Sequence, residues 1–206
     1  MTVFRRHGFR RSSIEETAEA AGLTRQALYH HFKSKEALFR AVIERVHDGA
    51  LADGATAAER TEAAGGTLAD IIVAQVAARL KAFVASFDGS PHVEELFSEH
   101  LIHARDLYQH YAALHDAQVA ATVERIVKRQ KLALAPGMTA AKLARFVELA
   151  ITGTKSAYPS MRPADAFLRD AEAMLRTLIA GAVAPSKPTK PSPSARPVRR
   201  KAGVRK

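Results

Sequence analysis

The sequence contains no cysteine among its 206 residues, which excludes a disulfide framework, a thiolate nucleophile and a cysteine-based zinc site. Long apolar runs are also missing. No uncharged run exceeds ten residues, whereas a membrane-spanning helix needs roughly 20. The N-terminus has no apolar signal stretch. We therefore expect a soluble, cytoplasmic protein with no membrane partner.

Acidic residues are absent from the C-terminal end. The chain has 31 Lys and Arg against 21 Asp and Glu, but residues 185–206 hold eight of the basic residues and no acid. The same segment holds five of the nine prolines, so we expect a disordered basic tail. The rest of the chain is closer to neutrality. This distribution excludes a uniformly polycationic nucleic-acid coat but permits a local anionic partner at either end.

Alternating β-branched runs are absent, and apolar residues recur at three- and four-residue spacing from Ser12 to about Ala184. This periodicity predicts an all-α fold. Capping residues and Gly or Pro breaks divide the helical region. We expect helices over 13–22, 24–32, 34–49, 67–87, 92–134, 139–157 and 163–184, with a loop over 49–66 and a break in the longest helix near Arg105 or His115.

Two short helices joined through Ala21, Gly22 and Leu23 have the dimensions of a helix-turn-helix. The outer face of the second helix carries side chains suited to DNA. Arg25 can reach guanine or a phosphate, and Gln26 can form a bidentate bond with adenine. His30 on this face can contact a phosphate or remain simply exposed to solvent. The predicted DNA-binding residues are Thr24, Arg25, Gln26, Tyr29, His30 and Lys35.

This region resembles the DNA-binding domain of the TetR/AcrR family of bacterial transcriptional regulators, over about residues 3–47. The resemblance rests on the spacing of Gly8-Phe9, Ser13-Ile14, Ala18, Ala21-Gly22-Leu23-Thr24, Leu28-Tyr29-x-His31-Phe32 and Lys35-x-x-Leu38. It implies a homodimer whose recognition helices bind an inverted-repeat operator on double-stranded DNA. It also implies a C-terminal domain that binds a small-molecule effector, which abolishes DNA binding.

Two positions depart from the family pattern. Thr17 stands where the family usually has a buried Ile, and its hydroxyl can bond back to the carbonyl four residues earlier. Only Met1 to His7 precede the Gly8-Phe9 turn, where the family has a full helix, and seven residues are marginal for helix formation. We therefore expect either that the true chain starts upstream in the same reading frame or that this form binds its operator weakly.

Aromatic residues and histidines gather between residues 83 and 111. His100 falls on an apolar stripe, so it is either a hydrogen-bonded core histidine or a polar group inside an effector pocket. His100, His103, Asp106 and His110 offer zinc ligands, but they spread over a wide arc, so we predict no metal site. Core packing is the alternative to pocket lining for the aromatic residues. The candidate effector-binding residues are Phe83, Phe87, Phe97, His100, Tyr108 and Tyr111.

The last two predicted helices carry apolar faces that would be ordinary core in a monomer. The family resemblance instead favours a four-helix dimer interface built from two such pairs. The predicted interface residues are Phe146, Ile151, Phe167, Met174, Leu175 and Leu178.

Together these expectations describe an all-α protein with a helix-turn-helix DNA-binding domain over 1–47, a helical ligand-binding and dimerisation domain over 48–184 and a tail over 185–206. We expect a ligand-responsive transcriptional repressor with no cofactor. The alternative is a small-molecule-binding or scaffold dimer that has lost operator binding. An enzyme is not expected: di-iron chemistry needs Glu-x-x-His on two helices, and only Glu44-x-x-His47 is present. Phosphate-loop, serine-hydrolase and zinc-protease signatures are missing as well.

Overall fold

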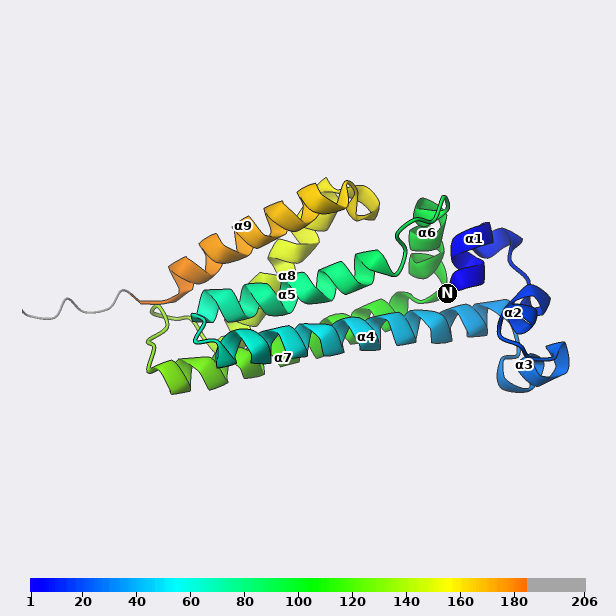
Figure 1. The fold of residues 1–206 in the computed structure, drawn as a ribbon. Coiled ribbons are helices and arrows are strands. Elements are labelled where there is room, and N and C mark those ends of the chain that lie inside the picture. Colours follow the sequence, from blue (N-terminus) through cyan, green and yellow to red (C-terminus); the bar gives the residue numbers. More distant parts are fainter. Residues whose placement is uncertain (185–206) are drawn as a thin grey trace, which may run out of the picture.

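The computed structural model describes residues 1–184, and these residues form an elongated all-helical molecule (Figure 1). The predicted basic tail, residues 185–206, lies outside the described residues. Within residues 1–184, no helix is both long enough and apolar enough to cross a bilayer. The helices are α1 (Thr2–Arg11), α2 (Ile14–Ala20), α3 (Arg25–His31), α4 (Lys35–Ala63), α5 (Leu68–Ala85), α6 (Val93–His103), α7 (Arg105–Gln130), α8 (Ala140–Ala157), the short 3-10 helix η1 (Pro159–Met161) and α9 (Ala164–Ala182).

Residues 2–7 are helical before Gly8, so the short stretch that we expected to be marginal does form helical turns. Gly8 interrupts α1 with φ +75°, a conformation that favours glycine, and a side chain there would collide with Glu95 of α6. Before this kink, Phe4 is 1% exposed and packs edge-on against Phe39 with ring centroids 5.1 Å apart. Phe9 closes the cluster from the other side of the kink, 4.9 Å from Phe39. Tertiary packing therefore stabilises a helix that would be marginal alone.

Helix α4 is much longer than expected. It begins after its N-cap Ser34, as predicted, but continues through Gly49 to Ala63 and crosses the proposed domain boundary at residue 47. The predicted loop over 49–66 is therefore wrong for most of its length. Gly54 faces α5 so closely that an added Cβ would lie 2.8 Å from the carbonyl oxygen of Gln75. The small residues that suggested a loop instead allow two helices to approach each other.

The other breaks follow the sequence closely. Ala104 separates α6 from α7, next to the expected break at Arg105. Thr67 and Thr139 cap α5 and α8 by accepting hydrogen bonds from backbone N–H groups, as their positions predict. The turns before α5 and before α8 therefore lie where the capping residues predict them.

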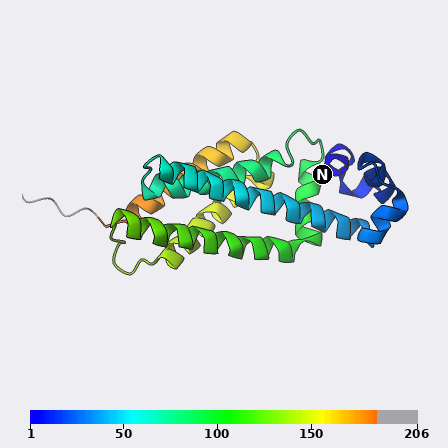
Figure 2. The ribbon, with the colours of Figure 1, turned by 60° about the horizontal axis from the view of Figure 1, so that its bottom comes forward.

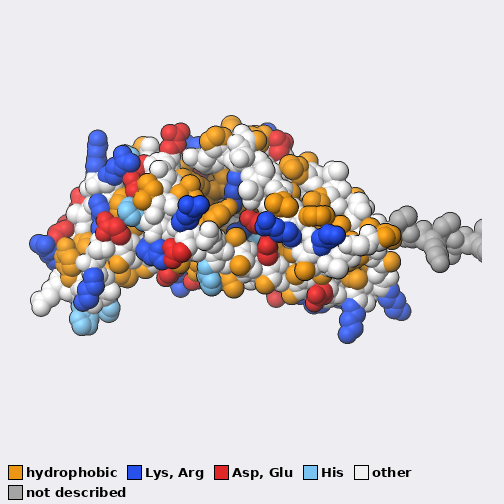
Figure 3. All heavy atoms as spheres, turned by 180° about the vertical axis from the view of Figure 1, so that it is seen from behind, with side chains coloured by type: hydrophobic (Ala, Val, Ile, Leu, Met, Phe, Trp, Pro, Cys, Tyr) orange, Lys and Arg blue, Asp and Glu red, His pale blue; other side chains and the backbone are white. Residues whose placement is uncertain are grey.

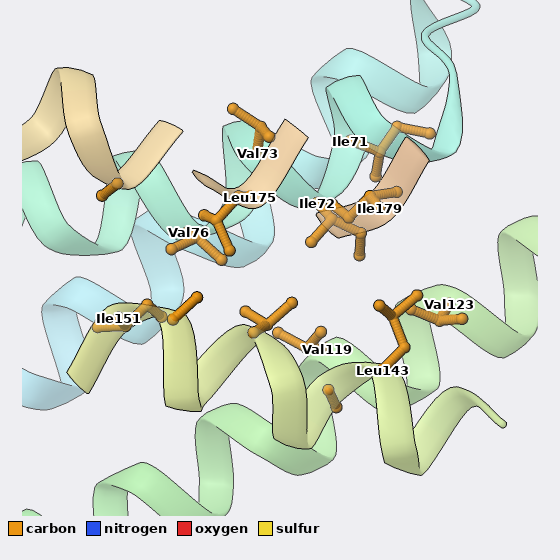
Figure 4. Packing of buried hydrophobic residues seen from close by; sticks show 14 of the residues in the cluster. Ile71, Ile72, Val73, Val76, Val119, Val123, Leu143, Ile151, Leu175 and Ile179 are labelled. Carbon is orange, nitrogen blue, oxygen red and sulfur yellow. The ribbon is translucent and has the colours of Figure 1, made fainter. Parts of the chain in front are cut away.

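Helices α5, α7, α8 and α9 enclose the larger of two hydrophobic cores (Figure 4). The second core joins α1, α2, α3 and the first half of α4 to α6 and the start of α7. Figures 1 and 2 show α1, α2 and α3 gathered at one end of the molecule, while α4 and α7 run along its length side by side. Helix α4 also contributes Ala58 to the larger core, so it belongs to both cores. The larger core includes Ile72, Val76, Val123, Leu143, Val147, Ile151, Phe167, Leu175 and Ile179.

Candidate functional site

The end of the molecule formed by α2 and α3 has the geometry of a helix-turn-helix. Ser13 and Glu16 form the predicted capping box at the start of α2, and the Thr17 hydroxyl donates to the Ser13 carbonyl at 2.9 Å. Gly22 takes φ +67° in the turn. Thr24 then caps α3 by accepting a hydrogen bond from the Ala27 N–H at 3.1 Å. These local bonds fix where α2 and α3 begin and how the turn joins them.

The outer face of α3 presents the predicted DNA-binding side chains to solvent. Arg25, Gln26 and His30 are exposed, while Leu28 on the opposite face is 5% exposed and packs into the core. Arg25 lies over the ring of Tyr29, with its guanidinium carbon 5.3 Å from the ring centroid. Its Nε also pairs with Glu15 at 2.7 Å. Arg25 would have to leave this surface ion pair, which contributes at most about 1 kcal/mol, to bind a base.

Lys35 lies at the start of α4 rather than on α3. Its Nζ donates to the Arg10 carbonyl at 3.2 Å and lies 4.6 Å from the ring centroid of Phe9. These contacts fix the ammonium group at the edge of the helix-turn-helix. The position is suited to a phosphate contact.

A cavity of about 270 Å³ opens among α4, α5, α6, α7, α8 and η1. Figure 3 shows a hollow bordered by hydrophobic side chains on this part of the surface. The apolar walls include Leu80, Phe83 and Phe97, and Met161 closes one side. The polar lining residues are His47, Arg79, His100, Tyr108 and Lys155, together with Tyr158 and Ser160.

Two buried histidines lie against each other at one side of the cavity. The Nε2 atoms of His47 and His100 are 3.5 Å apart, and the His47 ring stacks on Tyr111 at 4.6 Å. Burial lowers the pKa of His47 to about 3 and that of His100 to about 4. Both imidazoles are therefore neutral at pH 7 and can each offer one donor and one acceptor. His100 is thus both a core histidine and a cavity-lining one.

Two cations also line the cavity. Arg79 is only 6% exposed, and its Nη1 atom has no hydrogen-bond partner among the described residues. Lys155, which is half-buried, lies with Nζ 5.2 Å from the ring centroid of Tyr108. Burial lowers the pKa of Lys155 to about 8, so at pH 7 this amine is mostly charged. The cavity is therefore apolar in its walls and positive in its polar groups.

The predicted effector residues fall into two groups. Phe83, Phe97, His100 and Tyr108 line the cavity. Phe87 and Tyr111 do not: Phe87 packs 4.8 Å from the Phe97 ring, and the Tyr111 hydroxyl donates to Asp48 at 2.6 Å. Sequence reasoning missed His47, Arg79 and Lys155. The available signal for Arg79 was its position on the apolar side of its helix, three residues after Val76 and four before Phe83.

One group of side chains outside the cavity lining has metal-ligand chemistry. Ligand atoms of His115, Asp116 and Glu148 lie within 4.8 Å of one another. Arg79 acts electrostatically on all three, which opposes a bound cation. The zinc set considered from the sequence does not converge, because Asp106 accepts a bidentate pair from Arg40 at 2.6 and 2.7 Å.

Residues 1–42 match the family described as bacterial regulatory proteins, tetR family. The match places a tetR-family domain at the N-terminal end of the chain, where α1, α2, α3 and the start of α4 lie. The fold of most of the chain is similar to that of two solved structures. A protein from Rhodococcus sp. classed with the TetR-family transcriptional regulators is 17% identical, with a TM-score of 0.61 over 89% of this chain and 93% of that one. The TetR-family regulator PfmR from Thermus thermophilus is 20% identical, with a TM-score of 0.53 over 87% and 94% of the two chains.

Two helices, α4 and α6, connect the helix-turn-helix to the cavity. Helix α4 packs Leu38 and Phe39 into the N-terminal core and contributes His47 to the cavity. Helix α6 carries Glu99, which pairs with Arg10 Nε at 2.8 Å, immediately before His100. The Arg10 backbone N–H also donates to Glu95 of α6 at 2.8 Å. Both elements that hold the two histidines therefore contact the DNA-binding domain.

The predicted dimer interface needs a correction. Ile151, Phe167 and Leu175 are at most 1% exposed within a single subunit, so they are core residues and unavailable to a second copy. They were assigned to the interface because they form the main apolar stripe of α8 and α9. That stripe packs into the core of the subunit, and the exposed apolar residues lie beside it. Met174 is 46% exposed, and Phe146 and Leu178 are half-buried. Leu149, not predicted, is 49% exposed.

Proposed function

We propose that this protein is a ligand-responsive transcriptional repressor of the TetR family. In this proposal a homodimer binds an inverted-repeat operator through α3 of each subunit. A small molecule entering the cavity then lowers the affinity for DNA. Thr24, Arg25, Gln26, Tyr29, His30 and Lys35 contact the DNA, and Phe83, Phe97, His100 and Tyr108 contact the effector.

The observation that carries the proposal is the physical connection between cavity and helix-turn-helix. His47 stands only eight residues after Phe39 on the same unbroken helix. His47 is 4% exposed and stacks on Tyr111, so a ligand that presses on its ring in this packed region pushes on α4. Because packed helices shift as rigid elements, a movement of α4 changes the position of α3.

The proposed dimer face consists of the exposed apolar side chains of α8 and α9, Leu149 and Met174, with the half-buried Phe146 and Leu178 beside them. Gly153, on the same side of α8 as Leu149, has nothing within 4 Å of the position of a Cβ. A second subunit could approach the helix closely there.

The experiment is a footprinting and gel-shift titration of the purified chain on the DNA upstream of its own gene. We expect protection of an inverted repeat. Arg25→Ala and Gln26→Ala should each relax base preference by about 1–3 kcal/mol, because they remove base contacts. Tyr29→Phe and Lys35→Ala should weaken binding to all sequences alike, because they remove phosphate contacts.

A matched control is Lys128→Ala, which removes an exposed charge from α7 at the opposite end of the molecule. It should change neither affinity nor preference. Equal binding to operator and unrelated DNA by the unmodified chain would refute operator recognition and favour the scaffold alternative. Altered base preference in Lys35→Ala, with none in Arg25→Ala, would refute the assignment of roles.

A further inference from the structure

The two cations of the cavity lack an acidic partner. Arg79 and Lys155 form no ion pair and no side-chain hydrogen bond with any other residue in the part of the chain that the structure describes. By contrast, Arg10, Arg25, Arg40, Arg125, Arg129, Arg169 and Arg176 each pair with a carboxylate within 3.1 Å. A guanidinium with 6% exposure and no partner is costly to desolvate.

The nearby acids do not neutralise this pair. Glu148 is buried, acts on both cations at a distance and lies 3.5 Å from His115 Nδ1. Asp116 also acts on Arg79 from a distance, and burial raises its pKa. Neither carboxylate forms an ion pair with Arg79 or Lys155, so both cations keep donors that a ligand in the cavity could use.

The lining of the cavity combines charged and apolar side chains. Arg79 on α5 and Lys155 on α8 supply the charge, whereas Leu80, Phe83 and Phe97 supply apolar surface. A volume of about 270 Å³ is at the small end for a ligand site. Only a compact molecule would fit.

We propose that the cavity binds a small organic acid, a carboxylate with an aromatic or aliphatic body. Its carboxylate lies between Arg79 and Lys155, and its body lies against Phe83 and Phe97. The guanidinium offers paired N–H donors that match a carboxylate, and the ammonium adds a point charge. This inference rests on the proposed function, because it names the chemical class of the effector.

The test is calorimetric titration of the full chain with straight-chain carboxylates from butanoate to decanoate and with 3-phenylpropionate. Each acid is compared with its own neutral amide, which keeps the body and removes the charge. We expect at least one acid to bind at least about tenfold more tightly than its amide, since bonds to charged groups are stronger. If every acid binds no better than its amide, or none binds, the inference is wrong.

Variants locate the site. Arg79→Met and Lys155→Met should abolish the preference for acid over amide. The melting temperature of the ligand-free protein should stay the same or rise, because an unpaired buried charge is replaced by an apolar side chain of similar length. The control is Lys81→Met, two residues after Arg79 on α5, whose exposed ammonium lies 3.8 Å from Glu172. It should keep the preference. A lower melting temperature with unchanged preference would assign Arg79 a structural role and overturn the inference.

A gel shift with and without the best acid separates this inference from the proposed function. Specific operator binding with no acid selectivity would leave the regulator in place and refute the anion site. Selective acid binding that leaves operator affinity unchanged would support the anion site and refute the ligand response.

Discussion

Replacing Gly54 by alanine should destabilise this protein, although the same replacement in a helix is ordinarily favourable. An alanine Cβ at this position would lie 2.8 Å from the Gln75 carbonyl oxygen and 3.3 Å from Arg79 Cβ. The first of these is a backbone atom in the middle of α5, which cannot rotate away. The contact can be relieved only by moving α4 and α5 apart.

Gly49 supplies the matched control five residues earlier on α4. An added Cβ there meets nothing within 4 Å. Gly49→Ala should therefore stabilise the protein by about 0.5–1 kcal/mol, the usual gain for removing a helical glycine. Gly54→Ala has the same gain but also overpacks the interface, which costs about 1–3 kcal/mol. The difference between the two variants, about 1–3 kcal/mol, isolates the contact between the helices.

The assay is urea unfolding followed by circular dichroism, with the midpoint and slope fitted for both variants. For a chain of this size each kcal/mol also moves the melting temperature by about 2–4 °C. Because Arg79 lies beside the new methyl group, Gly54→Ala should also weaken acid binding, while Gly49→Ala should not. Equal stability of the two variants would refute the argument that close helix approach requires Gly54.

Further predictions concern the core and its titrating groups. Leu175→Asp should unfold the subunit, because it buries a charge at a cost of several kcal/mol. Met174→Asp should leave the subunit folded and dissociate the proposed dimer. Urea unfolding measures the stability of both variants, and light scattering measures their oligomeric state. Lowering the pH from 7 to 5 should destabilise the protein. Buried His47 and His100 have pKa values of about 3 and 4 in the folded protein, whereas both are near 6.5 in the unfolded chain. In this pH range the unfolded chain therefore binds more protons, which favours unfolding. His100→Asn should lose less stability between pH 7 and pH 5 than the unmodified protein. The measurement is the urea midpoint of each protein at both pH values.

The helix-turn-helix was predictable because its signals are local. Ser13, Glu16 and Thr24 make the capping bonds that their spacing predicts, each to a group three residues away along the chain. The break at Ala104 and the turn after α8 have no side-chain cap, but they too lie close to the positions that the length of the apolar pattern and Pro159 predict. A capping residue acts on its own helix, so no knowledge of the rest of the fold is needed.

The length of α4 and the polar lining of the cavity were not predictable in this way. Gly49 and Gly54 suggest a loop until α5 is known to pack against the helix. Arg79 and Lys155 are 76 residues apart and belong to helices α5 and α8, so no sequence spacing brings them together. The prediction of which side of α9 is exposed was wrong for a related reason. Met174 and Leu175 are neighbours in the sequence, and only the packing of α5 and α8 shows which one is buried.

The proposed coupling also needs only a modest difference in energy. A hundredfold change in DNA affinity corresponds to about 2.7 kcal/mol of coupling, within the usual range of about 1–3 kcal/mol for allosteric proteins. The junction between α1 and α6 holds several contacts that could share this energy. Glu99, 5% exposed, binds Arg10 Nε at 2.8 Å and lies 3.1 Å from His103 Nε2, and the Arg10 N–H donates to Glu95 at 2.8 Å. Because the Arg10 side chain is 72% exposed, its pair with Glu99 contributes about 1 kcal/mol. A ligand that moves His100 shifts the residue next to Glu99. Straining these contacts together on both subunits would supply a coupling energy of the required size without any larger rearrangement.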